Sequence, residues 1–260
     1  MHITDIYNQA AAEGRARFSV ELLPPLKGDG PGRVFEALDP LREFAPVSVN
    51  VTSHREDVKY VERENGLLER HTVRRRPGTV GISAAIMRRY GVEAIPHLIC
   101  GGQSRYDLED ALIDLDFLGI DNVLALRGDI PKGQDIDWET AEFRHAADLV
   151  RFAKAHYPDM GIGVAGYPAP HPESPSFASD WRYTVAKISE GADFVITQLF
   201  FDVREYLHFV DRLSDMGVSV PVIPGILPIQ SLESIRRTLS LCGANIPGKL
   251  YLALEEANAK

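Results

Sequence analysis

The chain has 260 residues, of which 45% are hydrophobic and 25% charged, and its formal net charge is −9. This composition is typical of a globular protein with a large core, and the acidic balance disfavours partners such as nucleic acid or an anionic membrane. The two cysteines, Cys100 and Cys242, lack metal-like spacing, so no metal is expected. No signal-like N-terminus and no run of 18 apolar residues is found, so we expect a cytoplasmic protein without a membrane span.

Segments with strand and helix patterns alternate along the chain. Strand 46–52, for example, places valines on one side and Ser48, Asn50 and Thr52 on the other. Segment 53–78 is charged and rich in turn residues, and we expect a loop or an excursion over one end of the fold. In chain order the sequence predicts helix 4–13, strand 17–23, helix 33–44, strand 46–52, helix 79–90, strand 94–100, helix 105–118 after an N-cap at Ser104, strand and turn 122–129, loop 130–142, helix 143–156, strand 161–167, a proline-rich loop 168–176, helix 177–191, strand 194–200, helix 203–216, strand 220–226, helix 231–241 and helix 247–258.

This alternation predicts parallel βαβ units, and therefore the α/β class. Seven units without a dinucleotide-binding fingerprint favour a (β/α)8 TIM-type barrel over a doubly wound sheet. A barrel of this kind needs eight strands for closure, and only seven are identifiable. We expect a single catalytic barrel domain over residues 1–260, without repeats or a linker.

A polar or aromatic residue stands near the C-terminal end of each of the first six predicted strands, where TIM-type barrels carry their chemistry. These residues are Glu21, Thr52, His97, Asp129, Tyr167 and Gln198. Glu21 lies in an apolar strand, where a carboxylate is costly to bury unless it is paired, protonated or used. If Val20 and Leu22 face the helices, Glu21 faces the barrel mouth.

Each of these residues also has an ordinary structural interpretation. Glu21 could simply lean into solvent, His97 could be a core histidine, and Asp129 is a common turn residue. Two residues outside the strands, His171 and Asp180, also have ordinary structural interpretations. His171 could shape a loop between prolines, and Asp180 could pair with Arg182 or stabilise the first turn of its helix.

Six short motifs, taken in order, resemble the methylenetetrahydrofolate reductases. The motifs are Phe18-Ser-Val-Glu-Leu-Leu-Pro-Pro25, Pro96-His-Leu-Ile-Cys100, Ala125-Leu-Arg-Gly-Asp-Ile-Pro131, Gly166-Tyr-Pro168 with His171-Pro-Glu173, Ile196-Thr-Gln-Leu-Phe-Phe-Asp202 and Ile223-Pro-Gly-Ile-Leu-Pro228. The resemblance runs from the first helix to about residue 250. That family is a flavin-containing (β/α)8 barrel, which uses FAD to pass a hydride from NADH or NADPH to 5,10-methylenetetrahydrofolate. The resemblance implies the same fold, cofactors and ping-pong reaction here, and we also expect a homo-oligomer.

The resemblance also implies roles for individual residues. Glu21 matches the general acid that protonates N10 of the folate, and a desolvated carboxyl can hold its proton near neutral pH. Asp129 matches an aspartate beside the flavin and the folate, and Gln198 matches a glutamine that contacts the folate. The residues at the FAD positions are Thr52, His97, Arg127, Gly128, Asp129, Tyr167, His171, Asp180 and Lys187, with Arg127 or Lys187 as the cation for the pyrophosphate.

The chain departs from the family pattern in two places. Family members continue for about one more helix and a closing strand that ends in an aromatic residue and an arginine near the folate. Members can also carry an aromatic residue that stacks on the ligand, and helix 231–241 has none. The missing eighth strand motivates an alternative, a non-catalytic or defective folate- or flavin-binding barrel that acts through a partner. A barrel lyase or aldolase is disfavoured, because no lysine stands late in a strand.

Overall fold

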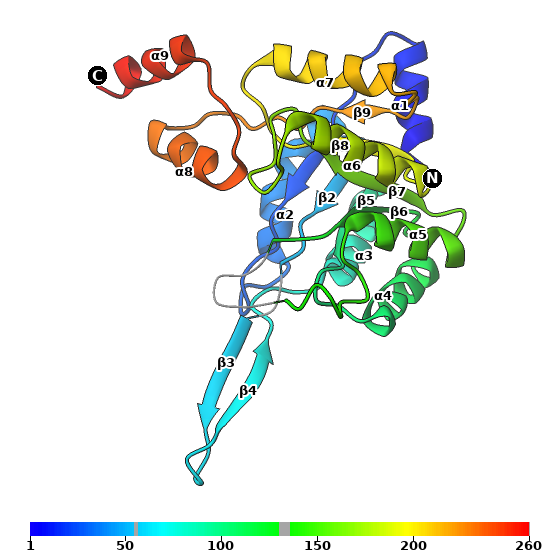
Figure 1. Cartoon of the computed structure of the whole chain (residues 1–260), viewed down its shortest axis with the longest axis vertical. Coiled ribbons are helices and arrows are strands. Elements are labelled where there is room, and N and C mark those ends of the chain that lie inside the picture. The colour runs from blue at the N-terminus through cyan, green and yellow to red at the C-terminus, as the bar shows by residue number, and fades with distance from the viewer. Residues whose placement is uncertain (55–56, 130–135, 260) are drawn as a thin grey trace. The chain divides into compact units, whose positions relative to one another are not determined.

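The computed structural model describes residues 1–54, 57–129 and 136–259, and the chain forms two compact units, Met1–Gly161 and Ile162–Lys260. Both units alternate strands with helices (Figure 1). The elements of the first unit are α1 (Ile3–Ala12), β1 (Val20–Leu22), α2 (Gly32–Leu38), the 3₁₀ helix η1 (Asp39–Phe44), β2 (Ser48–Val51), β3 (Asp57–Glu62), β4 (Leu68–Val73), α3 (Thr79–Tyr90), β5 (Glu93–Ile99), α4 (Arg105–Phe117), β6 (Asn122–Leu126) and α5 (Ala146–His156). Those of the second are β7 (Gly161–Gly166), α6 (Phe177–Ser189), β8 (Phe194–Thr197), α7 (Val203–Asp215), β9 (Val222–Ile223), α8 (Leu232–Cys242) and α9 (Gly248–Asn258).

The strands that follow one another through helices are parallel in both units. In the first unit the order is β1-β2-β5-β6, with Glu21 opposite Asn50 and Asn50 opposite Ile95. In the second unit the order is β7-β8-β9. The described residues therefore hold seven parallel strands of a barrel-type α/β fold, which confirms the predicted class and the number of strands. The expectation of one domain over residues 1–260 stays a prediction.

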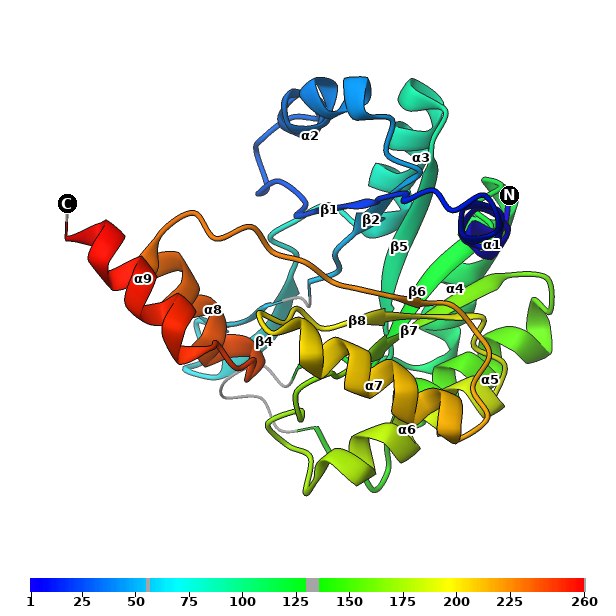
Figure 2. The same cartoon turned by 90° about the horizontal axis from the view of Figure 1, so that it is seen from above.

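The helix-facing side of the first sheet is apolar. Val20 and Leu22 of β1 belong to the same buried cluster as Val49 and Val51 of β2. This cluster packs on α2 and α3, which cover one side of the strands in Figure 2, through Val34, Leu38, Ile82 and Ile86. Because successive side chains in a strand alternate, Glu21 and Asn50 lie on the opposite face. Burying one such apolar side chain contributes about 1.5–3 kcal/mol, so a one-residue slip that turned this face outward would be strongly disfavoured.

The helix predicted over 33–44 changes its character at Leu38. The α-helix α2 ends there, and the chain continues as η1, with Pro40 in the first turn. Proline has no backbone N–H and its ring crowds the preceding turn, so it is tolerated where a helix starts and disfavoured inside one. The sequence prediction placed the helical residues correctly and missed this break.

Residues 57–73 form an antiparallel hairpin, β3 and β4, where the sequence predicted only a loop or an excursion. At its turn, Gly66 has a φ of 75° and the backbone N–H of Leu67 donates to Oδ1 of Asn65 at 3.1 Å. An Asn-Gly pair between two alternating segments is a strong hairpin signal, and this signal was overlooked. Figure 1 shows the hairpin projecting from the rest of the first unit.

The run of arginines after β4 anchors the base of this hairpin. Arg75 forms an ion pair with Asp57 at the start of β3, and Arg76 donates a hydrogen bond to the carbonyl oxygen of Pro24. The N–H of Lys27 also donates to the carbonyl of Arg75 at 2.7 Å. Arg75 and Arg76 therefore join the hairpin to the segment that follows β1.

In the second unit, α7 packs closely on β7. A side chain at Gly166 would collide with Phe209 of α7, whose ring is 1% exposed. Helices α8 and α9 contact each other, and Arg236 on α8 forms a 3.0 Å ion pair with Glu255 on α9. Across the described ranges, no helix is long and apolar enough to span a membrane.

Candidate active site

The predicted site residues of the first unit stand near or just beyond the carboxyl ends of its parallel strands. Glu21 is the middle residue of β1, Thr52 follows β2, and His97 lies within β5. Arg127, Gly128 and Asp129 follow β6 directly, and the remaining motif residues, Ile130 and Pro131, lie outside the described residues. In the second unit, Tyr167 follows β7 and Gln198 follows β8. Within each unit the positions agree with the placement that the sequence predicted.

Glu21, Asn50 and His97 share one face of the first sheet. Glu21 and Asn50 are register partners on adjacent strands, and His97 lies two residues beyond Ile95, the β5 partner of Asn50. Oε2 of Glu21 is 3.9 Å from Nε2 of His97, which is beyond hydrogen-bond distance. These three side chains form a polar group that we call the Glu21 cluster.

Two atoms of the Glu21 cluster are buried without a hydrogen bond. They are Oδ1 of Asn50 and Nε2 of His97, and neither has a partner among the described residues. Leaving a buried polar group unsatisfied costs about 1–3 kcal/mol, so such groups are rare in folded proteins and often mark functional sites. Asn50 was not predicted as a site residue, although its place between Ser48 and Thr52 on the polar side of its strand was a usable signal.

The surroundings of the cluster favour its neutral forms. Burial, and to a lesser extent the nearby His54, lowers the pKa of His97 to about 4, so His97 is uncharged at neutral pH. Burial, and then the charge of Arg76, lowers the pKa of His54. The Glu21 side chain is 63% exposed, yet surrounding protein displaces much of its hydration and raises the pKa of the carboxyl. A carboxyl with a raised pKa is suited to donate a proton.

The other predicted residues of the first unit are held by local contacts. The Thr52 hydroxyl donates to the carbonyl of Leu22 at 3.3 Å and so joins the end of β2 to β1. The Arg127 guanidinium lies over the ring of Trp138, 5.5 Å from its centre. Gly128 has a φ of 80°, which favours glycine, and the turn leaves Asp129 exposed. Arg127 and Asp129 are therefore presented by the turn after β6.

Four predicted residues of the second unit meet in one cluster. The Tyr167 and His171 rings pack edge to face at 4.9 Å, and the Lys187 ammonium lies 5.8 Å from the Tyr167 ring centre. Asp180 lies in the first turn of α6, which is one of the positions considered from sequence, and its buried carboxylate accepts the backbone N–H of His171 at 2.8 Å. Burial lowers the pKa of Lys187 to about 8, and the nearby Asp180 opposes this shift. The Lys187 ammonium donates to the carbonyl of Ala165.

Gln198 lies just beyond β8 and is held by two hydrogen bonds. Its backbone N–H donates to the Gly166 carbonyl at 2.7 Å, and its side-chain Oε1 accepts the N–H of Leu199 at 2.9 Å. Next to it, the N–H of Gly225 donates to the Thr197 hydroxyl at 2.9 Å. A Cβ atom at Gly225 would come within 2.2 Å of the Thr197 carbonyl oxygen, so only glycine allows this approach.

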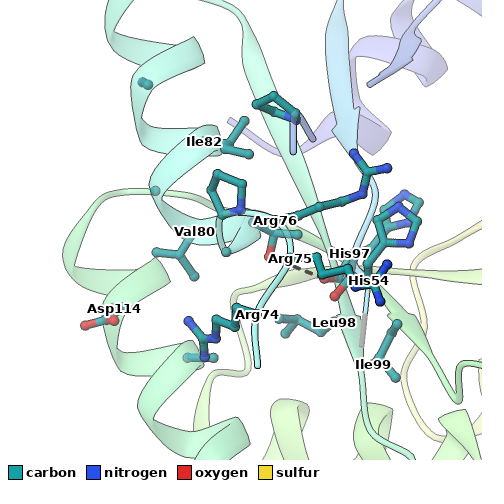
Figure 3. A pocket seen from close by; sticks show the side chains of 18 of the residues that line it. His54, Arg74, Arg75, Arg76, Val80, Ile82, His97, Leu98, Ile99 and Asp114 are labelled. Carbon is teal, nitrogen blue, oxygen red and sulfur yellow. Dashed lines mark hydrogen bonds between the residues drawn. The ribbon is translucent and has the colours of Figure 1, made fainter. Parts of the chain in front are cut away.

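A cavity of about 960 Å³ in the first unit borders the two histidines. Figure 3 shows His54 and His97 close together, with Arg76 extending toward them. Its apolar wall includes Val80 and Ile82 of α3, and α4 adds aspartates. The cavity thus reaches the surroundings of the Glu21 cluster. In the described part of the chain, no three His, Cys, Asp or Glu residues are grouped so that they could hold a metal ion.

Comparison with known proteins gives matches along the whole chain. The sequence model of the family described as Methylenetetrahydrofolate reductase matches residues 6–260. The chain is 35% identical to the 5,10-methylenetetrahydrofolate reductase of Pectobacterium carotovorum subsp. carotovorum, over 92% of this chain and 74% of that protein. It is 33% identical to the 5,10-methylenetetrahydrofolate reductase of Escherichia coli (strain K12), over 94% of this chain and 75% of that protein.

Other relatives are much longer than this chain. It is 33% identical to the probable methylenetetrahydrofolate reductase (NADH) of Oryza sativa subsp. japonica, over 98% of this chain and 42% of that protein. It is 34% identical to the probable methylenetetrahydrofolate reductase (NADPH) of Caenorhabditis elegans, over 92% of this chain and 34% of that protein. The chain therefore spans less than half the length of these plant and nematode relatives.

Solved structures share the fold at low sequence identity. One is an uncharacterized protein from Clostridium thermocellum that binds two copies of 5-methyl-5,6,7,8-tetrahydrofolic acid. It matches with a TM-score of 0.57 and 15% identity, over 96% of this chain and 79% of that chain. Tryptophan synthase of Mycobacterium tuberculosis matches with a TM-score of 0.54 and 14% identity, over 94% and 88%. At such identities the likeness shows the fold alone.

Proposed function

Because the chain belongs to the methylenetetrahydrofolate reductase family, we propose that it reduces 5,10-methylenetetrahydrofolate to 5-methyltetrahydrofolate with electrons from NADH or NADPH, through bound FAD. The names of the rice and nematode relatives specify NADH and NADPH respectively, which supports a nicotinamide donor and leaves the choice between the two open. One site that serves both the nicotinamide and the folate implies that they bind in turn, with ping-pong kinetics.

The observation that carries this proposal is the state of Glu21. Its carboxyl has a raised pKa and lies beside two buried polar atoms that no described residue satisfies. A protonated carboxyl can donate its proton to N10 of the folate, so that the bond from N10 to the methylene carbon breaks and a 5-iminium cation forms. The Glu21 carboxylate is then reprotonated from solvent. General acid catalysis of this kind contributes about 10²–10⁴-fold in rate.

The residues that would hold FAD have chemistry that suits it. Lys187 offers a partly buried ammonium with three N–H donors, one of which bonds to the Ala165 carbonyl. Phosphate oxygens are strong acceptors that could take up the others. His97 offers a buried ring nitrogen without a described partner. When bound, FAD supplies two-electron hydride chemistry, and the protein positions and tunes it. The proposed FAD residues are Thr52, His97, Arg127, Gly128, Asp129, Tyr167, His171, Asp180 and Lys187.

Two further residues are proposed to contact the folate. Asp129 is exposed beyond β6, and a carboxylate there would stabilise the cationic iminium that forms when the ring opens. Gln198 offers a side-chain amide beyond β8, and its NH₂ group can donate to the folate. These roles follow from the family match and from the positions of both residues just beyond strand ends.

Substitution of Glu21→Gln tests the proposal. The variant keeps the shape of the side chain and removes the proton that it donates. We expect bleaching of the flavin by NADH or NADPH to continue at the original rate, while reduction of methylenetetrahydrofolate falls at least about 100-fold. Glu36→Gln, at an exposed position of α2 in the same unit, is the matched control and should leave both half-reactions unchanged.

Each half-reaction is followed separately by rapid-mixing absorbance spectroscopy. Folate reduction at the original rate in Glu21→Gln would remove Glu21 from the role of general acid. Loss of both half-reactions with retained flavin would show instead that Glu21 acts in donor binding.

A further inference from the structure

Asn50 is the least explained member of the Glu21 cluster. Asn50 is 6% exposed, and its Oδ1 has no hydrogen-bond partner in the described ranges. It is the direct register partner of Glu21, so the two side chains leave neighbouring strands on the same face. A buried acceptor next to an acid that can carry a proton is suited to accept a hydrogen bond from it.

We propose that Asn50 is a positioning residue for Glu21, whose side-chain oxygen accepts the carboxyl O–H of Glu21 and holds that acid ready for the substrate. The inference rests on the proposed function, in which Glu21 donates a proton. When Glu21 loses its proton, the Asn50 oxygen faces a carboxylate with no proton between them. Asn50 therefore stabilises the protonated form more than the ionised form.

Other titratable and charged groups around Glu21 in this unit act differently. His97 on β5 is neutral above its pKa of about 4, and its Nε2 is 3.9 Å from the carboxyl. His54, beyond the end of β2, lies near Arg76, and positive charge on either would favour the carboxylate. Among these neighbours, Asn50 is the one that favours the acid form through an acceptor oxygen.

The test is the titration of Glu21 in Asn50→Leu, followed by ¹³C NMR of carboxyl-labelled glutamate in the full chain. The Glu21 signal is identified by its absence from Glu21→Gln. Leucine fills a similar volume but cannot accept a hydrogen bond. We expect the pKa of Glu21 to fall by about one unit, a tenfold change in its ionisation constant. Burial beside an apolar side chain alone would raise this pKa, so a fall identifies the lost acceptor.

Ser48→Ala is the matched control. Ser48 is buried on the same face of β2, and its hydroxyl bonds to the Ser19 hydroxyl at 2.9 Å rather than to Glu21. We expect no change in the Glu21 titration in this variant. In Asn50→Leu, the rate of the folate half-reaction should be lost at a pH about one unit lower than in the original chain. Flavin reduction by the nicotinamide donor should be unchanged.

An unchanged or raised pKa of Glu21 in Asn50→Leu would overturn the inference. Should that variant fail to fold, Asn50→Asp keeps the shape and gives the second measurement. Two adjacent carboxyls share a proton, so Glu21 and the new carboxyl should titrate as a coupled pair, and independent titration would equally overturn the inference. The titration of Glu21 by NMR does not depend on enzyme turnover. Failure of the proposed function would be seen in a different experiment, as folate reduction at the original rate by Glu21→Gln.

Discussion

A buried, uncharged histidine beside an acid is the central residue-level feature of this protein. His97 lies on β5 with an 8% exposed side chain, and its pKa is lowered to about 4 because its charged form would lose its hydration. Keeping His97 neutral prevents it from forming a strong ion pair with Glu21, which would hold that carboxyl ionised. The histidine thus helps to preserve Glu21 as an acid.

The pKa of His97 predicts a dependence of stability on pH. In the unfolded chain this histidine takes up its proton near pH 6.5, whereas in the folded chain it does so near pH 4. The contribution of His97 to stability is therefore complete above pH 6.5 and is lost as the pH falls from 6.5 toward 4. Between pH 7 and pH 5 the loss amounts to about 2 kcal/mol.

His97→Gln should remove this loss, as measured by urea unfolding at both pH values. The exposed His156→Gln variant on α5 serves as the control and should keep the original dependence. The same fall in unfolding free energy in His97→Gln as in the original chain would contradict the assignment of His97 as a buried neutral group.

Most of the candidate site residues could be selected from the sequence, and Asn50 shows why one could not. Glu21 was conspicuous as a charge in an apolar strand, and His97 as a polar residue at a strand end. Asn50 is a neutral amide in a strand of alternating polarity, where such a residue most often faces solvent. Its significance depends on a neighbouring strand, β1, and on the absence of a described partner for its oxygen.

At the level of elements, the alternation of helices and parallel strands was predictable and the irregular segments were not. Strand β8 ends at Thr197, so Gln198 lies just past the strand, although the sequence suggested a strand to residue 200. At the end of β8, Gly225 approaches Thr197 closely, and this contact between segments that are distant in the sequence could not be predicted from local patterns. The β3–β4 hairpin was not predicted either, although the Asn65-Gly66 pair marks its turn.

The Gly225 contact predicts a specific effect on Gln198. In Gly225→Ala, the new Cβ would overlap the Thr197 carbonyl, so the end of β8 must shift together with Gln198. We expect a loss of about 1–3 kcal/mol in stability, as for other overpacked sites. If Gln198 contacts the folate, KM for methylenetetrahydrofolate should rise about tenfold, with flavin reduction unaffected.

Gly248→Ala, at the start of α9, has no atom within 4 Å of the new Cβ and is the matched control. Thermal unfolding and steady-state kinetics give the two readouts. An unchanged melting temperature in Gly225→Ala would refute the close approach, and an unchanged KM with lowered stability would separate Gln198 from folate binding.

At the level of the whole molecule, each unit brings together residues that the sequence predicted separately. The first presents the Glu21 cluster and the turn with Arg127 and Asp129, and the second gathers Tyr167, His171, Asp180 and Lys187. The proposed function would use both groups, the first as a proton donor for the folate and the second as contacts for the cofactor. The chain spans less than half of the length of the plant and nematode relatives. The central claim to test is therefore that this chain by itself reduces methylenetetrahydrofolate.

The flavin spectrum of the purified chain tests this claim most directly. We expect yellow protein, either as isolated or after reconstitution with FAD, whose absorption near 450 nm is bleached anaerobically by NADH or NADPH and restored by 5,10-methylenetetrahydrofolate. The product should be 5-methyltetrahydrofolate, in a one-to-one ratio with the oxidised donor. Colourless protein that does not take up FAD, or bound flavin that methylenetetrahydrofolate fails to reoxidise, would contradict the account.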